Sequence, residues 1–81
     1  MIIVGLRDKV SSRFEGITMA VNEYVAKRDF SFAVNNNKEM LFKAKDLELY
    51  KVGEFDVETG QIDYISPMVR LCSGDEVKEY D

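Results

Sequence analysis

A single cysteine and the absence of histidine restrict most strongly how this 81-residue chain can be stabilised. One cysteine cannot form a disulfide within the chain, and the usual zinc ligand sets cannot be assembled within one subunit. The fold must therefore depend on one hydrophobic core, which in so short a chain gives only a small net stability. We expect a single domain that buries further apolar surface by self-association, most simply as a homodimer.

The same composition excludes several kinds of function. Without histidine, a Ser-His-Asp triad or a histidine acid–base catalyst cannot be built. The five glycines are scattered, so no glycine-rich phosphate-binding loop is present. We expect no enzyme activity, no metal and no cofactor. The apolar run at the N-terminus is too short for a signal peptide or a membrane span, and a lone cysteine fits a reducing compartment, so we expect a cytoplasmic protein without a membrane partner.

Alternating apolar residues predict several strands. The first covers residues 2–9, and a second, irregular strand covers residues 14–20, where Gly16 indicates a bulge or bend. Residues 47–55 and 61–65 predict two further strands. A helix is predicted between these two pairs of strands, which indicates the α+β class: one helix packed on an antiparallel sheet of three to five strands.

The helix is predicted from its cap and its apolar spacing. Asn22 is a suitable N-cap, and the helix should end at residues 35–37, because asparagine tolerates the left-handed conformation. Apolar residues at helical spacing predict one buried face, made of Ala26, Phe30, Ala33 and Val34. Residues 38–46 are compatible with a loop or with a short helix.

The segment after residue 55 begins with a turn signal. Asp56 can accept hydrogen bonds from backbone N–H groups, and Gly60 can take a positive φ. Pro67 should end the fourth strand or begin a short fifth one at a sheet edge, with residues 68–72 as the last apolar run. The predicted organisation is one domain over residues 1–74 and an acidic, frayed tail over residues 75–81.

Acidic and basic residues are distributed unevenly along the chain. Residues 1–51 hold nine basic and seven acidic residues, whereas residues 52–81 hold two basic and eight acidic ones, which gives the net charge of −4. The first part could attract phosphate backbones, or the acidic residues could simply keep a small protein soluble. Single-strand binders combine basic grooves with aromatic side chains, and Phe14, Phe42 and Tyr50 lie near basic residues, although aromatics at such positions more often belong to the core.

Two other groups could carry chemistry. Carboxylates gather around the predicted turn, at Glu54, Asp56, Glu58 and Asp63. They could bind a divalent cation or act in acid–base catalysis, but acidic residues beside a turn are more often there for backbone hydrogen bonding. Cys72 lies in an apolar run without a histidine partner, so we expect a buried, unreactive thiol.

Two segments resemble a known phage family. Residues 46–60 contain a strand with Leu-Tyr, then Gly-x-Phe-Asp, then Thr-Gly, and residues 22–35 contain an asparagine cap, an Arg-x-Phe pair and a closing Val-Asn. Both resemble the small non-structural proteins of gokushovirus-type microviruses, which are phages with single-stranded DNA genomes. The resemblance covers about residues 14–74. It implies a phage-encoded accessory protein that acts in genome replication in the infected bacterium by binding DNA and favouring single-strand synthesis for packaging.

The leading hypothesis is therefore a non-enzymatic protein that binds single-stranded DNA by electrostatics in the cytoplasm of the bacterial host. The candidate nucleic-acid-binding residues are Arg7, Lys9, Arg13, Lys27, Arg28, Lys43, Lys45, Tyr50 and Lys51. The alternative is a protein-interaction module that recruits a replication protein through an exposed strand edge, without direct DNA contact. A small structural or scaffold component of the particle is a third hypothesis.

Overall fold

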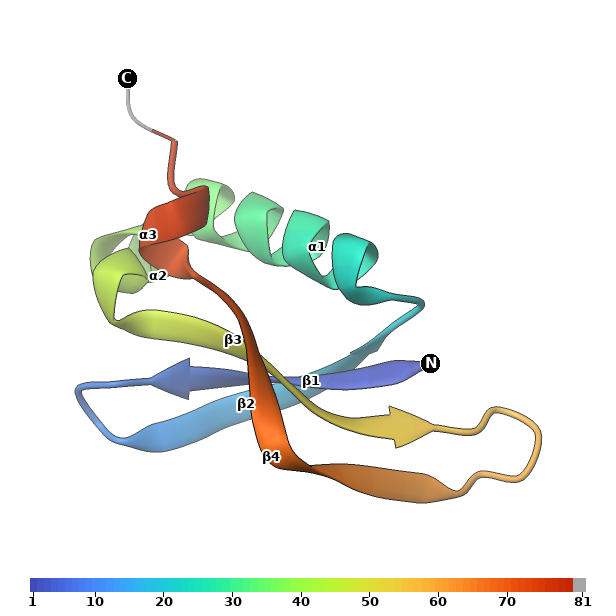
Figure 1. Ribbon diagram of the computed structural model, residues 1–81. Helices are drawn as coiled ribbons and strands as arrows, with labels where there is room; N and C mark the ends of the chain where they lie inside the picture. Colours follow the sequence, from blue (N-terminus) through green and yellow to red (C-terminus); the bar gives the residue numbers. More distant parts are fainter. Residues whose placement is uncertain (80–81) are drawn as a thin grey trace.

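Two strands, a helical segment and two further strands follow one another along the chain, in the order expected for the α+β class. The structure is a computed structural model that describes residues 1–79. Its elements are β1 (Ile2–Asp8), β2 (Arg13–Ala20), α1 (Glu23–Asn36), α2 (Lys38–Lys43), a 3₁₀ turn η1 (Ala44–Asp46), β3 (Leu47–Phe55), β4 (Ile62–Ser73) and α3 (Gly74–Val77). The strands form one antiparallel sheet in the order β2-β1-β3-β4, and the helices lie on one side of it (Figure 1). The predicted fold class is confirmed.

The first hairpin contains the irregularity that Gly16 indicated. Leu6 pairs with Gly16 and Arg7 pairs with Phe14, so Glu15 is an extra residue in β2. A bulge of this kind bends the strand and increases its twist. The predicted bulge is thus confirmed, and β1 becomes a central strand, because it pairs with β2 on one side and β3 on the other.

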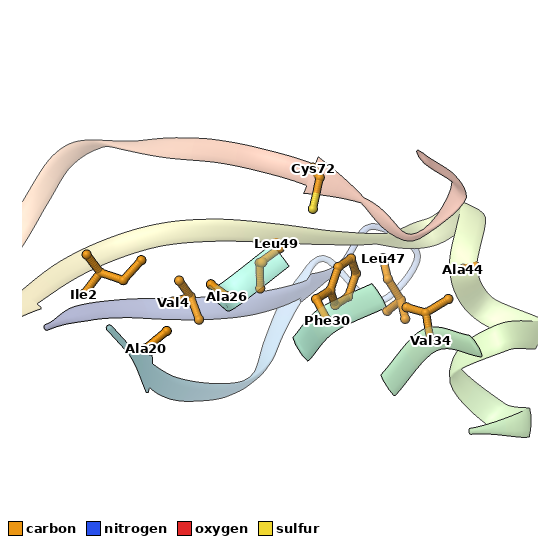
Figure 2. Packing of buried hydrophobic residues seen from close by; sticks show 10 residues of the cluster. All are labelled: Ile2, Val4, Ala20, Ala26, Phe30, Val34, Ala44, Leu47, Leu49 and Cys72. Atoms are coloured by element: carbon orange, nitrogen blue, oxygen red, sulfur yellow. The ribbon is translucent and has the colours of Figure 1, made fainter. Parts of the chain in front are cut away.

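Helix α1 begins as its sequence predicts, and three of the four residues of its predicted face are buried, while Ala33 is half-buried. The Asn22 side chain accepts a hydrogen bond from the Val25 backbone N–H at 2.9 Å, as an N-cap does. Ala26, Phe30 and Val34 are buried against the sheet, where Figure 2 shows them among side chains of β1 and β3. Hydrophobic burial of this single stripe holds the helix layer to the sheet.

The end of α1 lies where we expected, but the reason is different. Asn37 has an extended backbone (φ −121°) and not a left-handed one. Its side chain accepts a hydrogen bond from the Met40 N–H at 3.1 Å, so it serves as the N-cap of α2. Residues 38–46, which the sequence left open between loop and helix, form α2 and η1. None of the helices described is both long and apolar enough to cross a membrane.

The turn between β3 and β4 confirms the role predicted for Asp56. Its carboxylate accepts hydrogen bonds from the backbone N–H groups of Glu58 at 2.9 Å and Thr59 at 3.2 Å. These donors stabilise the ionised form and lower the pKa of the Asp56 carboxyl. Gly60 takes a positive φ of 78°, as a turn glycine can. Local hydrogen bonding accounts for the acidic residue at this position.

Strand β4 corrects the prediction of two short strands. Ile62–Ser73 is one continuous strand, with Pro67 inside it. Proline is tolerated there because β4 is an edge strand, so one side of its backbone has no neighbouring strand to receive an N–H. Register shifts opposite β3 let the long strand bend while it stays paired.

The segment after Ser73 is more ordered than we predicted. Ser73 accepts a hydrogen bond from the Glu76 N–H at 3.2 Å and starts α3. The Asn35 side chain of α1 donates to the Val77 carbonyl oxygen at 2.9 Å and accepts from the Glu79 N–H at 2.8 Å. The expectation of a frayed tail is therefore wrong for residues 75–79, because these hydrogen bonds tie it to α1. The rest of the predicted tail, residues 80–81, lies outside the described residues.

The start of α3 gives a stability prediction. A Cβ added at Gly74 would meet the Ala44 carbonyl oxygen and lie 2.8 Å from the Ala44 Cα, which is backbone and cannot rotate away. We expect Gly74→Ala to lower the free energy of unfolding by about 1–3 kcal/mol, measured by urea denaturation. Gly16→Ala is the control, since a Cβ there has no atom within 4 Å. Equal stability of the two variants would contradict the packing of α3 on η1.

Candidate nucleic-acid interface

The face of the sheet opposite α1 is uncovered in the part of the chain that the structure describes (Figure 1). We call it the open face. Residues on it follow from the strand register and from packing against Gly5 and Gly53: Ile3, Phe14, Ile17, Met19, Tyr50, Val52, Phe55, Ile62 and Tyr64. The open face is thus apolar and aromatic, although no element of the fold described here packs on it.

Aromatic side chains on the open face are held in defined positions. The Phe14 and Tyr50 rings meet edge to face, with centroids 5.9 Å apart and planes at 69°. Phe14 also lies over Gly5, where a Cβ would be only 2.9 Å from its ring. Tyr64 lies farther along the same face, opposite Gly53, and is 83% exposed. Phe14 and Tyr50 are thus held by packing, and the exposed ring of Tyr64 offers a further stacking surface to a ligand.

Five of the basic residues predicted to bind nucleic acid lie at one end of the sheet. Asp8, at the end of β1, pairs with the first residues of β2 and β3, and the Lys9 N–H donates to the Asp46 carbonyl oxygen at 2.8 Å. This end, which we call the basic end, therefore combines the β1–β2 hairpin with α2 and η1. It holds Arg7, Lys9, Arg13, Lys43 and Lys45.

Acidic residues also lie at the basic end, namely Asp8, Glu15, Glu39 and Asp46, and two of them have partners of their own. The buried Asp8 side chain accepts from the Val10 N–H at 2.9 Å. Glu39 pairs with Lys43 at 3.0 Å, which raises the pKa of the lysine. Among the described residues, Arg7, Lys9 and Arg13 have no carboxylate within ion-pair distance. These three cations are free to meet an external anion.

Three other candidates do not join the basic end. Lys27 and Arg28 lie on α1, on the far side of the sheet from the open face, and Arg28 pairs with Asp29 at 3.1 Å. Lys51 is opposite Val4, on the helix side of β3, and its Nζ lies 3.5 Å from Glu54. The sequence grouped these residues by their position in the chain, but the sheet separates them in space.

Two polar residues beside Tyr50 on the open face, Tyr64 and Arg70, were missed by the sequence analysis. Tyr64 could be placed only once its pairing with Gly53 was known. Arg70 lies opposite Tyr50, and its guanidinium bonds Glu48 at 2.9 Å and also Glu76. Both carboxylates raise the pKa of Arg70, while Arg70 lowers the pKa of Glu76. The sequence assigned Arg70 to the acidic last third of the chain, so its position beside Tyr50 was missed.

The opposite end of the sheet carries negative charge. Residues 52–69, which include the β3–β4 hairpin, contain no lysine or arginine. Their acidic residues are Glu54, Asp56, Glu58 and Asp63. No three potential metal ligands converge in the described part of the chain. The charge asymmetry of the sequence becomes, in this region, a difference between the two ends of the sheet.

A comparison with protein families agrees with a phage origin. The family model described as "Phage ORF5 protein" matches residues 1–77. The chain belongs to the phage ORF5 protein family. Searches of the curated proteins and of the solved structures each find no match to this phage protein. The family match supports the phage part of the resemblance noted for residues 22–35 and 46–60.

Cys72 of this phage protein is buried, as predicted, at 5% exposure in the core. Burial raises the pKa of the thiol, because the thiolate would lose its hydration. We expect native protein to react with a disulfide reagent at neutral pH at least tenfold more slowly than urea-unfolded protein, followed by absorbance. Equal rates for native and unfolded protein would show that the thiol is accessible.

Proposed function

We propose that this phage protein is a non-enzymatic accessory protein of genome replication or packaging that binds single-stranded DNA on its open face. Within the phage ORF5 family, the resemblance of residues 22–35 and 46–60 favours the gokushovirus-type microviruses. The proposed site of action is the cytoplasm of the infected bacterium, where such a genome is copied.

One observation carries the proposal: the open face presents aromatic rings beside Arg7, a cation unpaired within the described chain, and Lys9 and Arg13 lie at the same end of the sheet. Tyr50 pairs with Gly5, and Gly53, the partner of Tyr64, pairs with Ile3, so the two tyrosines are two positions of β1 apart, about 7 Å along a strand. Bases of an extended single strand could stack on these rings without base-specific contacts. Arg7 pairs with Phe14 on the same face, so a cation lies beside the first stacking surface.

Electrostatics favour the basic end as the place where the phosphate backbone binds. Lys9 and Arg13 flank the hairpin there and are exposed. The acidic β3–β4 hairpin repels phosphate, and this repulsion would keep DNA toward the other end of the sheet. A polarised surface of this kind can bind a polyanion although the chain has a net charge of −4.

The alternative function is a protein-interaction module that recruits a replication protein without direct DNA contact. It is supported by the free edge of β2, which is eight residues long and exposed from Arg13 to Met19. Such an edge can accept an added strand. Failure of the purified protein to bind single-stranded DNA even at low salt would favour this alternative.

The stacking part of the proposal predicts different effects for two tyrosines of equal exposure. Tyr64 on the open face is 83% exposed, and Tyr24 on α1 is 82% exposed. Stacking contributes about 1–3 kcal/mol per base, so we expect Tyr64→Ala to weaken binding about 5- to 150-fold and Tyr24→Ala to leave it unchanged. Fluorescence anisotropy with a labelled oligothymidine measures both. Equal effects of the two substitutions would argue against stacking on the open face.

The electrostatic part predicts a change in salt dependence. The logarithm of the affinity should fall linearly with the logarithm of salt concentration, with a slope of about −0.7 for each phosphate contacted. Arg7→Ala should make this slope shallower by about 0.7 in the same anisotropy assay, because Arg7 pairs with Phe14 on the open face. Arg28→Ala is the matched control, because Arg28 lies on α1 and pairs with Asp29. An affinity independent of salt would overturn the electrostatic part.

A further inference from the structure

The isolated chain exposes more surface than a compact monomer of its mass should. Its accessible area is 5639 Å², whereas a folded monomer of 9.3 kDa is expected to expose about 5,000 Å². The excess, about 600 Å², is close to the roughly 800 Å² that each partner buries in a standard interface. The isolated chain therefore exposes, in excess of a compact monomer, most of the area that one partner buries in such an interface.

Strand β2 is the least covered element of the sheet. Every residue from Arg13 to Met19 is exposed, and the outer edge of the strand has no neighbour. Edge strands usually carry charges or proline that prevent pairing with other chains. Residues 16–20, by contrast, read Gly-Ile-Thr-Met-Ala and contain neither. Beyond the bulge at Glu15, this edge is therefore suited to accept another strand.

A groove lies beside the same stretch on the helix side. It separates α1 from β2 and encloses about 330 Å³. Its lining is mostly apolar and includes Leu6, Gly16, Thr18, Ala20, Phe30 and Ala33, with Asp29 also lining it. A Cβ at Gly16 would have open space around it. A strand added to β2 would thus find room for side chains on this face as well.

We infer that the occupant of this edge is a second copy of the chain, with β2 of one protomer paired antiparallel to β2 of its partner. In one register all five residues of the unbulged stretch pair, with Thr18 on the two-fold axis. Ile17 then faces Met19 of the partner subunit on the open face. Gly16 faces the partner's Ala20 on the helix side. The exposed apolar side chains of Ile17 and Met19 thus contact each other across the interface. The small residues Gly16 and Ala20 lie on the helix side, where the helix layers of the two protomers approach.

Self-pairing fits this strand better than a foreign peptide does. Ile17 is 72% exposed and Met19 is 50% exposed in the isolated chain. Antiparallel pairing places Ile17 of each protomer beside Met19 of the partner subunit, so the symmetric contact covers both side chains in both protomers. The stretch holds no charge that would demand an oppositely charged partner. The bulge at Glu15 ends the pairing on one side, which limits the contact to one short, closed dimer.

The dimer has a consequence for DNA that rests on the proposed function. A two-fold axis perpendicular to the sheet keeps both open faces on the same side. The two four-stranded sheets become one continuous sheet, with two sets of aromatic rings facing the same ligand. A single strand of DNA could then contact both protomers, which raises the apparent affinity without new kinds of contact.

Sedimentation without DNA tests the dimer separately from the proposed function. We expect wild-type protein at micromolar concentration to sediment at twice the chain mass of 9.3 kDa. Thr18→Lys places two like charges together on the axis and should give monomers. Met68→Lys, on the opposite edge strand β4 and 45% exposed, should leave the dimer intact. A circular-dichroism melt of each variant checks that it is folded.

A cross-linking experiment tests the register. Residues directly opposite in an antiparallel pair have Cβ atoms about 4.5–5.5 Å apart, so a short bis-maleimide, which alkylates one thiol at each end, should join Thr18→Cys protomers in high yield. Met68→Cys is the control, and Cys72 is buried in both proteins. Monomeric wild-type protein, or a dimer that Thr18→Lys leaves intact, would overturn the inference. Capture of an extended peptide by monomeric protein would instead assign the β2 edge to a foreign partner.

Discussion

Burial of one narrow helical stripe against the middle of the sheet determines what the rest of the molecule leaves exposed. Ala26, Phe30 and Val34 pack with residues of β1 and β3, including Val4 and Leu49. A helix with its side chains is about 10 Å wide, and neighbouring strands are about 4.8 Å apart. One helix can therefore cover the central strands of a four-stranded sheet but not both edges. In this protein β2 is left open beside α1, and the far face of the sheet has no cover in the described chain.

These uncovered surfaces explain why the two proposals concern different parts of the same sheet. The open face carries rings and neighbouring cations, which suits a flexible polyanion with bases to stack. The β2 edge carries no charge beyond its bulge and offers backbone groups to another strand. Pairing at the edge leaves the open face accessible. The two surfaces can thus be used together, and each can be tested without the other.

Local patterns were sufficient wherever a residue acts on its near neighbours. The Asn22 cap, the Asp56 turn and the bulge beside Gly16 all follow from backbone chemistry within a few residues. Sequence patterns gave the wrong prediction where a residue's conformation depends on a hydrogen-bond partner that the local pattern does not reveal. Asn37 caps a second helix, which a run of three asparagines does not reveal. Residues 75–79 are ordered because Asn35, some forty residues earlier, hydrogen-bonds to them.

The candidate site likewise contains residues that the sequence could predict and residues that only strand pairing could place. Residue type and spacing identified the cations of the first hairpin, which are close together in the chain, and Tyr50, which is next to Lys51. Tyr64 and Arg70 reach the open face only through the β3–β4 register, and Lys51 leaves it because the alternation places it beneath α1. By itself the sequence determined the α+β class, the caps and turns, and the excess of acidic residues after residue 51. The tertiary structure alone decided which side chains share a surface, since strand pairing brings together residues that are far apart in the chain.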